Sequence, residues 1–268
     1  MNEKVSFFDL TILIPVRIDS SYRKWNLLSV LNFYKNLTGI SFIVLEADST
    51  QKITNEINGI NNINYLYIKD DNEIFHRTHY INEMLTQVET KYAAIWDTDA
   101  IAPYEQLHNA LEILRNNAKF IISYPYDGCF WSVNNYFSKR FHEILDITIL
   151  TEFPQCRHLM CGYRSVGGAF IVNVKNYWNI GAENEHFIGW GPEDAERFKR
   201  CEILTEKPKR IKGSLFHLWH PRGLNSGDFN KDLAISTKKE YCNVCSMSKE
   251  QLIKYINSWK WVKEYLKK

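Results

Sequence analysis

The sequence predicts an α/β fold, with a Rossmann-like, mostly parallel central sheet and helices on both of its faces. Two observations support this prediction. In the first half of the chain, short β-branched apolar segments alternate with segments whose apolar residues recur at helical spacing, which is typical of parallel sheets. The chain also has 268 residues, of which 45% are hydrophobic and 14% aromatic, enough for one large core.

Each apolar run is followed in order by a polar loop or a segment of helical periodicity. The first run is stopped by a proline, as expected of a buried strand that enters a loop. We expect strands at 10–16, 41–45, 63–68, 92–96 and 120–124, and helices at 20–37, 78–88 and 105–116. The asparagine-rich residues 55–64 predict a loop or a frayed helix end.

The charge balance and the apolar runs exclude several classes of protein. The 33 Lys and Arg against 31 Asp and Glu give a net charge of +2, without the basic excess of nucleic-acid binders. No apolar run approaches the roughly 18 residues that a membrane-spanning helix needs. Glu3, Lys4 and Asp9 surround a short N-terminal apolar stretch, which does not resemble a signal peptide. We expect a cytoplasmic protein that does not bind nucleic acid.

Six cysteines are spread along the chain, and in a reducing compartment we expect free thiols. Cys242 and Cys245 form a C-x-x-C pair, which is half of the usual set of four zinc ligands. Cys156 and Cys161 are more widely spaced and distant in sequence, so no second pair has suitable spacing. The sequence therefore favours ordinary thiols over a zinc site.

Three polar segments, at 17–19, 46–49 and 97–99, lie just past the ends of predicted strands. Ligands of parallel sheets bind at the carboxyl ends of strands, so we expect these segments to share one site. Neither G-x-G-x-x-G nor G-x-x-x-x-G-K-[ST] occurs in the chain. Dinucleotide and P-loop binding therefore have no support in the sequence.

Asp97-Thr98-Asp99 follows the fourth predicted strand and is the first motif that carries chemistry. Two carboxylates two residues apart at a strand end can hold a hard divalent cation against a diphosphate. The same residues, with Pro103 and Glu105, would also suit a turn and the start of the next helix. This D-x-D alone does not decide between the two interpretations.

His217 and His220 form an H-x-x-H motif beside Trp219 and Pro221. Two histidines three residues apart can face the same side and share a metal or a phosphate. A histidine pair near a tryptophan is, by itself, more often packing. Joined to the D-x-D it would supply the nitrogen ligands of a mixed oxygen and imidazole set, which Mn²⁺ accepts.

The third motif is Gly189-Trp190-Gly191-Pro192-Glu193-Asp194, preceded by Gly167-Gly168. An indole beside carboxylates is a common way to hold sugars, because the ring stacks on C–H faces and the acids bind hydroxyls. A carboxylate at such a place can also take a proton from an attacking hydroxyl. The alternative is a Gly-Trp turn before a helix whose dipole Glu193 and Asp194 complement.

Taken together and in order from residue 11 to 221, these motifs resemble the β-1,4-galactosyltransferase family, which has a GT-A-type fold. The matching segments are Pro15-Val16-Arg17 on that family's P-F-R, Phe75-His76-Arg77 with Asn82 on F-N-R-x-x-x-x-N, Asp97-Thr98-Asp99 on D-V-D, Gly167-Gly168 on a glycine pair, Gly189 to Asp194 on G-W-G-G-E-D, and His220 on a metal histidine. His217 lies where the family has methionine. Pro192 replaces a glycine and Asp19 a basic residue, while 44–49 resemble the V-V-D-D-x-S of bacterial family 2 transferases.

The resemblance implies a metal-dependent, inverting glycosyltransferase that moves Gal, GalNAc, Glc or GlcNAc from a UDP-sugar. The acceptor would be a carbohydrate or a lipid-linked saccharide, in bacterial surface polysaccharide synthesis. Asp194 would be the base, and Asp99 with His220 and His217 would bind Mn²⁺ or Mg²⁺. The implied nucleotide-sugar residues are Pro15, Arg17, Asp19, Glu46, Arg77, Asp97, Gly168, Trp190 and Glu193. The transferase domain would cover 1–225, with a nucleotide-binding half to about 125 and an acceptor half after it, and 226–268 would be a helical extension.

Two other classes of protein share some of these features. A sugar-phosphate nucleotidyltransferase also has an α/β sheet and a metal carboxylate, but its first loop is glycine-rich, whereas residues 16–20 contain no glycine. A carbohydrate-binding module could use Trp190 as a platform. It would not need the D-x-D or the H-x-x-H motif.

The C-terminal residues 248–268 predict a basic amphipathic helix. They carry six lysines against Glu250 and Glu264, a local charge of +4, and apolar residues at helical spacing. Such a helix can lie on an anionic membrane, here the inner membrane that would hold a lipid-linked acceptor. It can equally pack its apolar stripe on the domain and leave its lysines in water.

Overall fold

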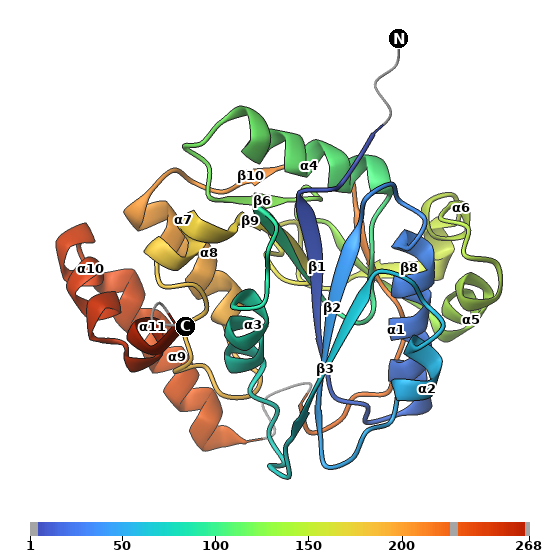
Figure 1. Cartoon of the computed structure of the whole chain (residues 1–268), viewed down its shortest axis with the longest axis horizontal. Coiled ribbons are helices and arrows are strands. Elements are labelled where there is room, and N and C mark those ends of the chain that lie inside the picture. The colour runs from blue at the N-terminus through green and yellow to red at the C-terminus, as the bar shows by residue number, and fades with distance from the viewer. Residues whose placement is uncertain (1–4, 226–229, 266–268) are drawn as a thin grey trace.

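The computed structural model of the chain describes residues 5–225 and 230–265, and its centre is a seven-stranded sheet (Figure 1). The strand order is β10 (Lys209–Arg210), β6 (Ile122–Tyr124), β9 (Ala169–Asn173), β4 (Tyr92–Trp96), β1 (Leu10–Val16), β2 (Ser41–Asp48) and β3 (Ile63–Lys69). Only β9 runs antiparallel to its neighbours β4 and β6. The mostly parallel sheet of the predicted α/β fold is therefore confirmed.

Helices cover both faces of this sheet, and α1 and α3 lie on opposite sides of the central strands (Figure 1). The helices that accompany this sheet are α1 (Ser21–Tyr34), α2 (Thr54–Ile57), α3 (Arg77–Leu85), α4 (Tyr104–Asn116), α7 (Val174–Asn179) and α8 (Glu193–Leu204). Helix α1 begins where it does because the Ser20 hydroxyl accepts the backbone N–H of Arg23, as an N-cap. Every residue of β1 is buried, as expected for a strand covered on both faces.

A second, four-stranded sheet lies beside the carboxyl end of β4. Its order is β5 (Ala100–Ile101), β11 (Leu215–His217), β7 (Phe130–Val133) and β8 (Arg157–Leu159), and α5 (Asn135–Ile144), α6 (Thr148–Thr151) and the 3₁₀ turn η1 (Pro154–Cys156) connect β7 to β8. The antiparallel register pairs His217 with Ala100. This pairing brings the second predicted histidine motif next to the D-x-D.

Strand β2 is longer than predicted, which changes the place of Glu46. The strand continues to Asp48 because β3 supplies a hydrogen-bonding partner along its whole length, with Glu46 opposite Tyr67. Glu46 is therefore a buried strand residue and not part of a polar loop. Residues 55–64 contain the end of the four-residue helix α2 and a loop, close to the prediction.

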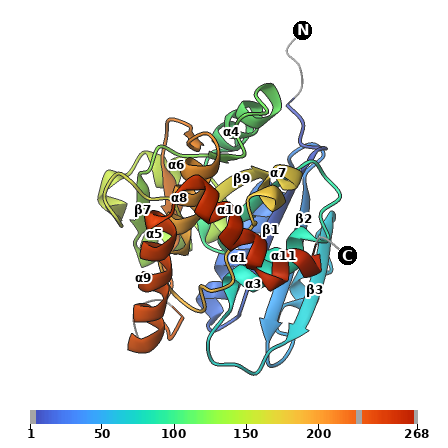
Figure 2. The same ribbon diagram turned by 90° about the vertical axis from the view of Figure 1, so that its left-hand side faces the viewer.

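The C-terminal part forms three helices, α9 (Lys231–Ser246), α10 (Lys249–Ser258) and α11 (Lys260–Tyr265), shown side-on in Figure 2. The single helix predicted from 248 is broken at Trp259, whose backbone is extended (φ −65°, ψ 123°). The predicted apolar stripe packs on the domain, since its members Leu252, Ile256, Trp259 and Val262 are buried. Leu266, Lys267 and Lys268 of that prediction lie outside the described residues. No helix in the described part of the chain has the length and apolar character needed to cross a bilayer.

Candidate active site

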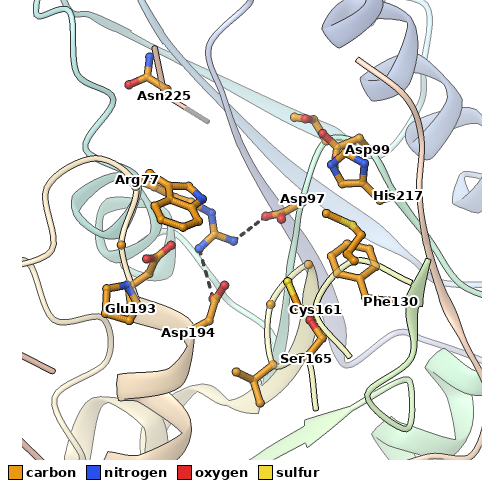
Figure 3. A pocket seen from close by; sticks show the side chains of 18 of the residues that line it. Arg77, Asp97, Asp99, Phe130, Cys161, Ser165, Glu193, Asp194, His217 and Asn225 are labelled. Carbon is orange, nitrogen blue, oxygen red and sulfur yellow. Dashed lines mark hydrogen bonds and ion pairs between the residues drawn. The ribbon is translucent and has the colours of Figure 1, made fainter. Parts of the chain in front are cut away.

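A cavity of about 910 Å³ opens at the carboxyl ends of β1 and β4, between the two sheets and the start of α8 (Figure 3). Sequence reasoning placed most of its polar residues there. The predicted residues that line it are Pro15, Arg17, Asp19, Arg77, Asp97, Asp99, Gly168, Trp190, Glu193, Asp194, His217 and His220. Segments far apart along the chain are thus brought to one site.

Glu46 is the exception, and its predicted role in nucleotide binding is wrong for this fold. Its carboxylate is fully buried and accepts hydrogen bonds from the Lys52 backbone N–H (2.9 Å) and the Tyr65 hydroxyl (2.5 Å). Glu46 does not line the cavity. Burial of the Tyr65 hydroxyl, followed by its hydrogen bond to Glu46, raises the pKa of Tyr65 to about 12.

Asp99, His217 and His220 converge at one end of the cavity. His217 Nε2 lies 3.5 Å from Asp99 Oδ1, and His220 Nε2 lies 3.3 Å from Asp99 Oδ2. One ligand atom from each residue falls within 4.8 Å of the others, and all three side chains are buried. The Leu218 N–H donates to the Asp99 carbonyl oxygen at 2.8 Å, which fixes the two segments against each other.

The nitrogen and oxygen atoms at this cluster suit a divalent cation. His220 Nδ1 lies 2.9 Å from the Pro221 carbonyl oxygen and 3.4 Å from Arg23 Nη2, and Nε2 is the ring nitrogen that faces Asp99. Burial lowers the pKa of His217 to about 4 despite the opposing charge of Asp99, so this ring is neutral at neutral pH. Burial would raise the pKa of Asp99, but the two histidines and Arg23 bring it below its ordinary value. One carboxylate and two imidazoles fit Mn²⁺, with Mg²⁺ less favoured by nitrogen ligands.

Arg23 shares this carboxylate with the histidines and was not predicted. Its Nη1 lies 3.1 Å from Asp99 Oδ2, and its other nitrogens contact Asp19. The spacing of Asp19 and Arg23, four residues apart at a helix start, is the sequence signal that could have pointed to it. Arg23 supplies a positive charge beside Asp99.

A second acidic pair, Glu193 and Asp194, begins α8 on the opposite wall. The glycine-rich turn before it is required by space, because Gly189 has φ +73° and a Cβ on Gly191 would meet Thr237 at 2.9 Å. Gly167 faces the pair from the other side, since a Cβ there would lie 2.4 Å from Asp194 Oδ2. Gly167 thus lets the backbone approach the Asp194 carboxylate closely, whereas Gly191 lets the turn pack against Thr237 of α9.

Burial, followed by the charge of Asp194, raises the pKa of Glu193 to about 8. Glu193 Oε2 is buried without a hydrogen-bond partner among the described residues. The side chain is therefore protonated at neutral pH and can donate a hydrogen bond into the cavity. Trp190 lies on the turn before it with 49% of its surface exposed, as a stacking platform requires.

Arg77 connects the two acidic groups across the cavity (Figure 3). Its Nη2 donates to Asp97 Oδ1 at 2.6 Å, and its Nη1 lies 4.0 Å from Asp194 Oδ1. Burial still leaves the pKa of Asp97 above its ordinary value, although Arg77 opposes it. The partner of Arg77 in the F-H-R-x-x-x-x-N motif has a structural role: Asn82 donates to the Glu183 carbonyl oxygen and accepts the Glu183 N–H, both at 3.0 Å.

Arg17 closes the opposite end of the cavity, where β1 ends. It donates to the backbone oxygens of Ala47 and Asn72 and forms an ion pair with Asp70, while its guanidinium carbon lies 5.3 Å from the Phe75 ring centre. Most of its donors are therefore used within the protein. Arg17 shapes this end of the cavity with Phe75 more than it offers free donors.

Several lining residues carry no motif and could not be picked out of the sequence. They include Phe130, Met160, Cys161, Arg164, Ser165, Arg222, Asn225, Lys238 and Tyr241. Lys238 and Tyr241 come from α9, so the predicted C-terminal extension contributes directly to the cavity.

A mostly parallel sheet with a D-x-D at a strand end, and a cavity shared with a second small sheet, define a glycosyltransferase of the GT-A type. Residues 11–233 match the family described as glycosyltransferase like family 2. The chain belongs to that family. A comparison with curated protein sequences found no match.

Solved structures with the same fold share little sequence with this chain. Glucosyl-3-phosphoglycerate synthase from Mycobacterium tuberculosis, in complex with Mn²⁺, UDP and phosphoglyceric acid, has a TM-score of 0.55 at 13% identity, over 89% of this chain and 78% of that one. A mannosyltransferase from Pyrobaculum calidifontis, in complex with GDP-Man and Mn²⁺, has a TM-score of 0.56 at 11% identity, over 97% and 74%. TarS of S. aureus has a TM-score of 0.54 at 10% identity, over 80% of this chain and 37% of that one.

Proposed function

We propose that this glycosyltransferase is metal-dependent and inverting, and that it moves a hexosyl group from a UDP-sugar to a hydroxyl of a carbohydrate acceptor. The observation that carries the proposal is the convergence of Asp99, His217 and His220 to within 4.8 Å, across the cavity from Glu193 and Asp194. A cation at the first cluster would face a leaving diphosphate, and a base at the second would face the acceptor.

The metal that fits the first cluster is Mn²⁺, held by Asp99, His220 and His217. When bound, it would supply positive charge to the diphosphate as the sugar departs. The named complexes with Mn²⁺ and UDP or GDP-Man support this choice of metal and a nucleotide-sugar donor. Both Arg77 and Asp97 lie between the clusters, where they can hold the nucleotide sugar.

Asp194 is proposed as the general base. It lies beside Arg77 and Arg197 and keeps 29% of its side chain exposed in the cavity, so it can reach the proton of an acceptor hydroxyl. Glu193, protonated, would donate a hydrogen bond to a sugar oxygen, and Trp190 would stack on a ring face. One base opposite one leaving group predicts a single displacement, which inverts the anomeric centre.

The same geometry supports the proposed division into domains. Residues up to about 125 supply the D-x-D and the nucleotide end, and 126–225 supply the histidines, the glycine pair and Glu193–Asp194. The helices after 230 add Lys238 and Tyr241 to the acceptor side of the cavity.

The setting of the reaction stays a prediction from the resemblance. This prediction comprises a lipid-linked saccharide acceptor, a role in bacterial surface polysaccharide synthesis, a cytoplasmic location and contact with the inner membrane. Because the apolar stripe of 248–265 is buried, a membrane contact through this segment would depend on its lysines. The family match favours the transferase over both the nucleotidyltransferase and the carbohydrate-binding module.

A donor screen tests the proposal. UDP-Gal, UDP-GalNAc, UDP-Glc and UDP-GlcNAc, with GDP-Man as a comparison, are incubated with Mn²⁺ or with a chelator, and release of nucleotide is measured. We expect one UDP-sugar to be cleaved in a metal-dependent way, and NMR of the product to show inversion. No cleavage of any donor, or equal cleavage with the chelator, would contradict the proposal.

A further inference from the structure

Arg197 is a fully buried arginine one turn into α8, directly behind the cavity. Its Nη1 donates to Asp194 Oδ1 at 2.8 Å, while Nε and Nη2 donate to the two oxygens of Glu183 at 2.8 and 3.0 Å. Its guanidinium carbon also lies 4.0 Å from the ring centre of Phe170. The planar guanidinium group of Arg197 therefore joins the proposed base to a second carboxylate that does not face the cavity.

Glu183 is itself held by further hydrogen bonds, which restrict the movement of the Arg197 guanidinium. It is 1% exposed and accepts the Tyr177 hydroxyl at 2.6 Å. Its backbone is held on both sides by the Asn82 amide. Burial alone would raise the pKa of Glu183, but the charge of Arg197 brings it below the ordinary value, so Glu183 is ionised.

The charges of this chain of contacts have a chemical consequence for Asp194. A full, unopposed cation at 2.8 Å would make a carboxylate a poor proton acceptor. Here both oxygens of Glu183 already neutralise the guanidinium, so Arg197 can orient Asp194 without withdrawing much of its proton affinity. The second oxygen of Asp194 lies against Gly167 and is left for the reaction.

We propose that Arg197 is a positioning residue, which sets the orientation of the Asp194 carboxylate, and that Glu183 preserves the basicity of Asp194 by neutralising Arg197. This inference rests on the proposed function, since it needs Asp194 to act on a hydroxyl. The other titratable groups near Asp194 are Arg77 from α3, Glu193 from α8 and Asp97 from the end of β4, with Tyr124 and Tyr126 at and just after the end of β6.

The chain offers a matched control on the same helix. Arg200 and Glu196 form a second buried Arg–Glu pair, with Nε 2.8 Å from Oε1 and both side chains at most 1% exposed. Arg200 also donates to the backbone oxygens of Ile180 and Ala182. This pair resembles the first in burial and geometry, but the Arg200 side chain donates to Glu196, Ile180 and Ala182 and not to Asp194. Its removal should therefore cost stability without touching the base.

The test compares double variants in which each pair is replaced by glutamines, so that no single buried charge is left without a partner. For Arg197→Gln with Glu183→Gln we expect kcat for the preferred UDP-sugar to fall about 10- to 100-fold, as misplacement of a reacting group does. The KM for the acceptor and the calorimetric Kd for UDP should change by less than about threefold. The Arg200→Gln with Glu196→Gln control should keep wild-type kcat.

The single variant Glu183→Gln is tested by the pH dependence of kcat, which a purely structural role of Glu183 would not shift. With Arg197 no longer neutralised, the Asp194 carboxylate stays ionised to lower pH, and the acid limb of kcat moves to lower pH. In the double variant lacking both charges the cation is gone, and the same limb moves to higher pH. If the acid limb of kcat moves in opposite directions in the two variants, the inference is supported.

The outcomes separate this inference from the proposed function. If the wild-type chain cleaves no sugar nucleotide, both fail together. If it does, and the Arg197–Glu183 double variant keeps wild-type kcat, or both double variants lose kcat equally, the positioning role alone is overturned. An unchanged acid limb in Glu183→Gln would overturn the role of Glu183.

Discussion

The two acidic clusters of the cavity differ in the charges that surround them. Around Asp99 the nearby histidines and Arg23 bring the pKa of the carboxylate below its ordinary value, although it is buried. Around the second cluster, Glu193 Oε2 has no hydrogen-bond partner within the described part of the chain, and burial, followed by the charge of Asp194, raises the pKa of Glu193 to about 8. The first cluster thus keeps a negative charge available for a cation, whereas the second holds a proton on Glu193 beside Asp194.

This difference teaches that similar side chains acquire separate tasks from their neighbours. At the strand ends, ring nitrogens aimed at one carboxylate predict metal binding. At the start of α8, the arginines beside Asp194 and the raised pKa of Glu193 support the proposed division of the pair into a base and a hydrogen-bond donor. Each of the following experiments changes one side of this comparison.

The largest effect is expected from Asp194→Asn, which removes the proposed base and keeps its size. Loss of a general base lowers kcat by about 10²- to 10⁴-fold. The calorimetric affinity for UDP should stay close to wild type, because the metal cluster on the other wall is untouched. Turnover comparable to wild type would move the base to Glu193 or elsewhere.

On the metal side, Asp99→Ala and His220→Ala should each weaken Mn²⁺-dependent UDP binding by at least about tenfold, since even indirect supports of a metal site can contribute this much. His217→Ala tests the third ligand in the same way. Circular dichroism of each variant controls for folding. UDP and Mn²⁺ binding like wild type in all three would show that the metal lies elsewhere.

A stability measurement tests the protonated state of Glu193. Its folded pKa of about 8 lies above the ordinary 4.5, so its ionisation in the unfolded chain favours unfolding increasingly between pH 4.5 and 8. Glu193→Gln cannot ionise and should stabilise the protein over this window, by on the order of 2 kcal/mol at pH 8 in urea unfolding.

Glu202, on the same helix, is the control for this prediction. Its hydrogen bond from Lys199 lowers its pKa, which is the opposite direction. In Glu202→Gln, the free energy of unfolding should therefore show no increase over wild type that grows between pH 4.5 and 8. If the difference between Glu193→Gln and wild type does not change with pH, the carboxyl is ionised in the folded protein.

The smallest effect concerns Arg23, which competes with a cation for Asp99 from 3.1 Å away. In Arg23→Gln the carboxylate loses this partner, and Mn²⁺ should bind a few-fold more tightly, an amount in keeping with a partly exposed ion pair. Titration of Mn²⁺ alone, followed by the signal of the free ion, measures it. Weaker binding in this variant would mean that Arg23 supports the site by holding Asp99 in place.

The elements that position the site were largely predictable from the sequence. Strand β4 and the D-x-D after it follow from an apolar run that ends in carboxylates, and Glu193 and Asp194 from a glycine-rich turn before a helix. The pairing of β5 with β11 could not be seen, because a two-residue strand has no periodicity. Only the motif order suggested that His220 meets Asp99.

Two features could not be predicted, because the sequence alone does not show which charged side chains are buried. Arg197 and Arg200 stand in a highly charged segment that resembles a solvated helix face, yet both are fully buried against carboxylates. Likewise Glu46 follows an apolar run like a loop residue, although β3 extends the pairing past it. The break at Trp259 has no proline or glycine to announce it, and arises as the indole packs into the core beside Gly181.

The central claim is that Asp99, His217 and His220 hold Mn²⁺ against the diphosphate of the donor. Electron spin-echo modulation of Mn²⁺ bound to the protein with UDP tests it directly, because it detects nuclei coupled to the ion. We predict couplings to two imidazole nitrogens, one lost in His217→Ala and the other in His220→Ala, together with coupling to phosphorus of UDP. Phosphorus coupling without any nitrogen coupling in the wild-type protein would contradict the claim.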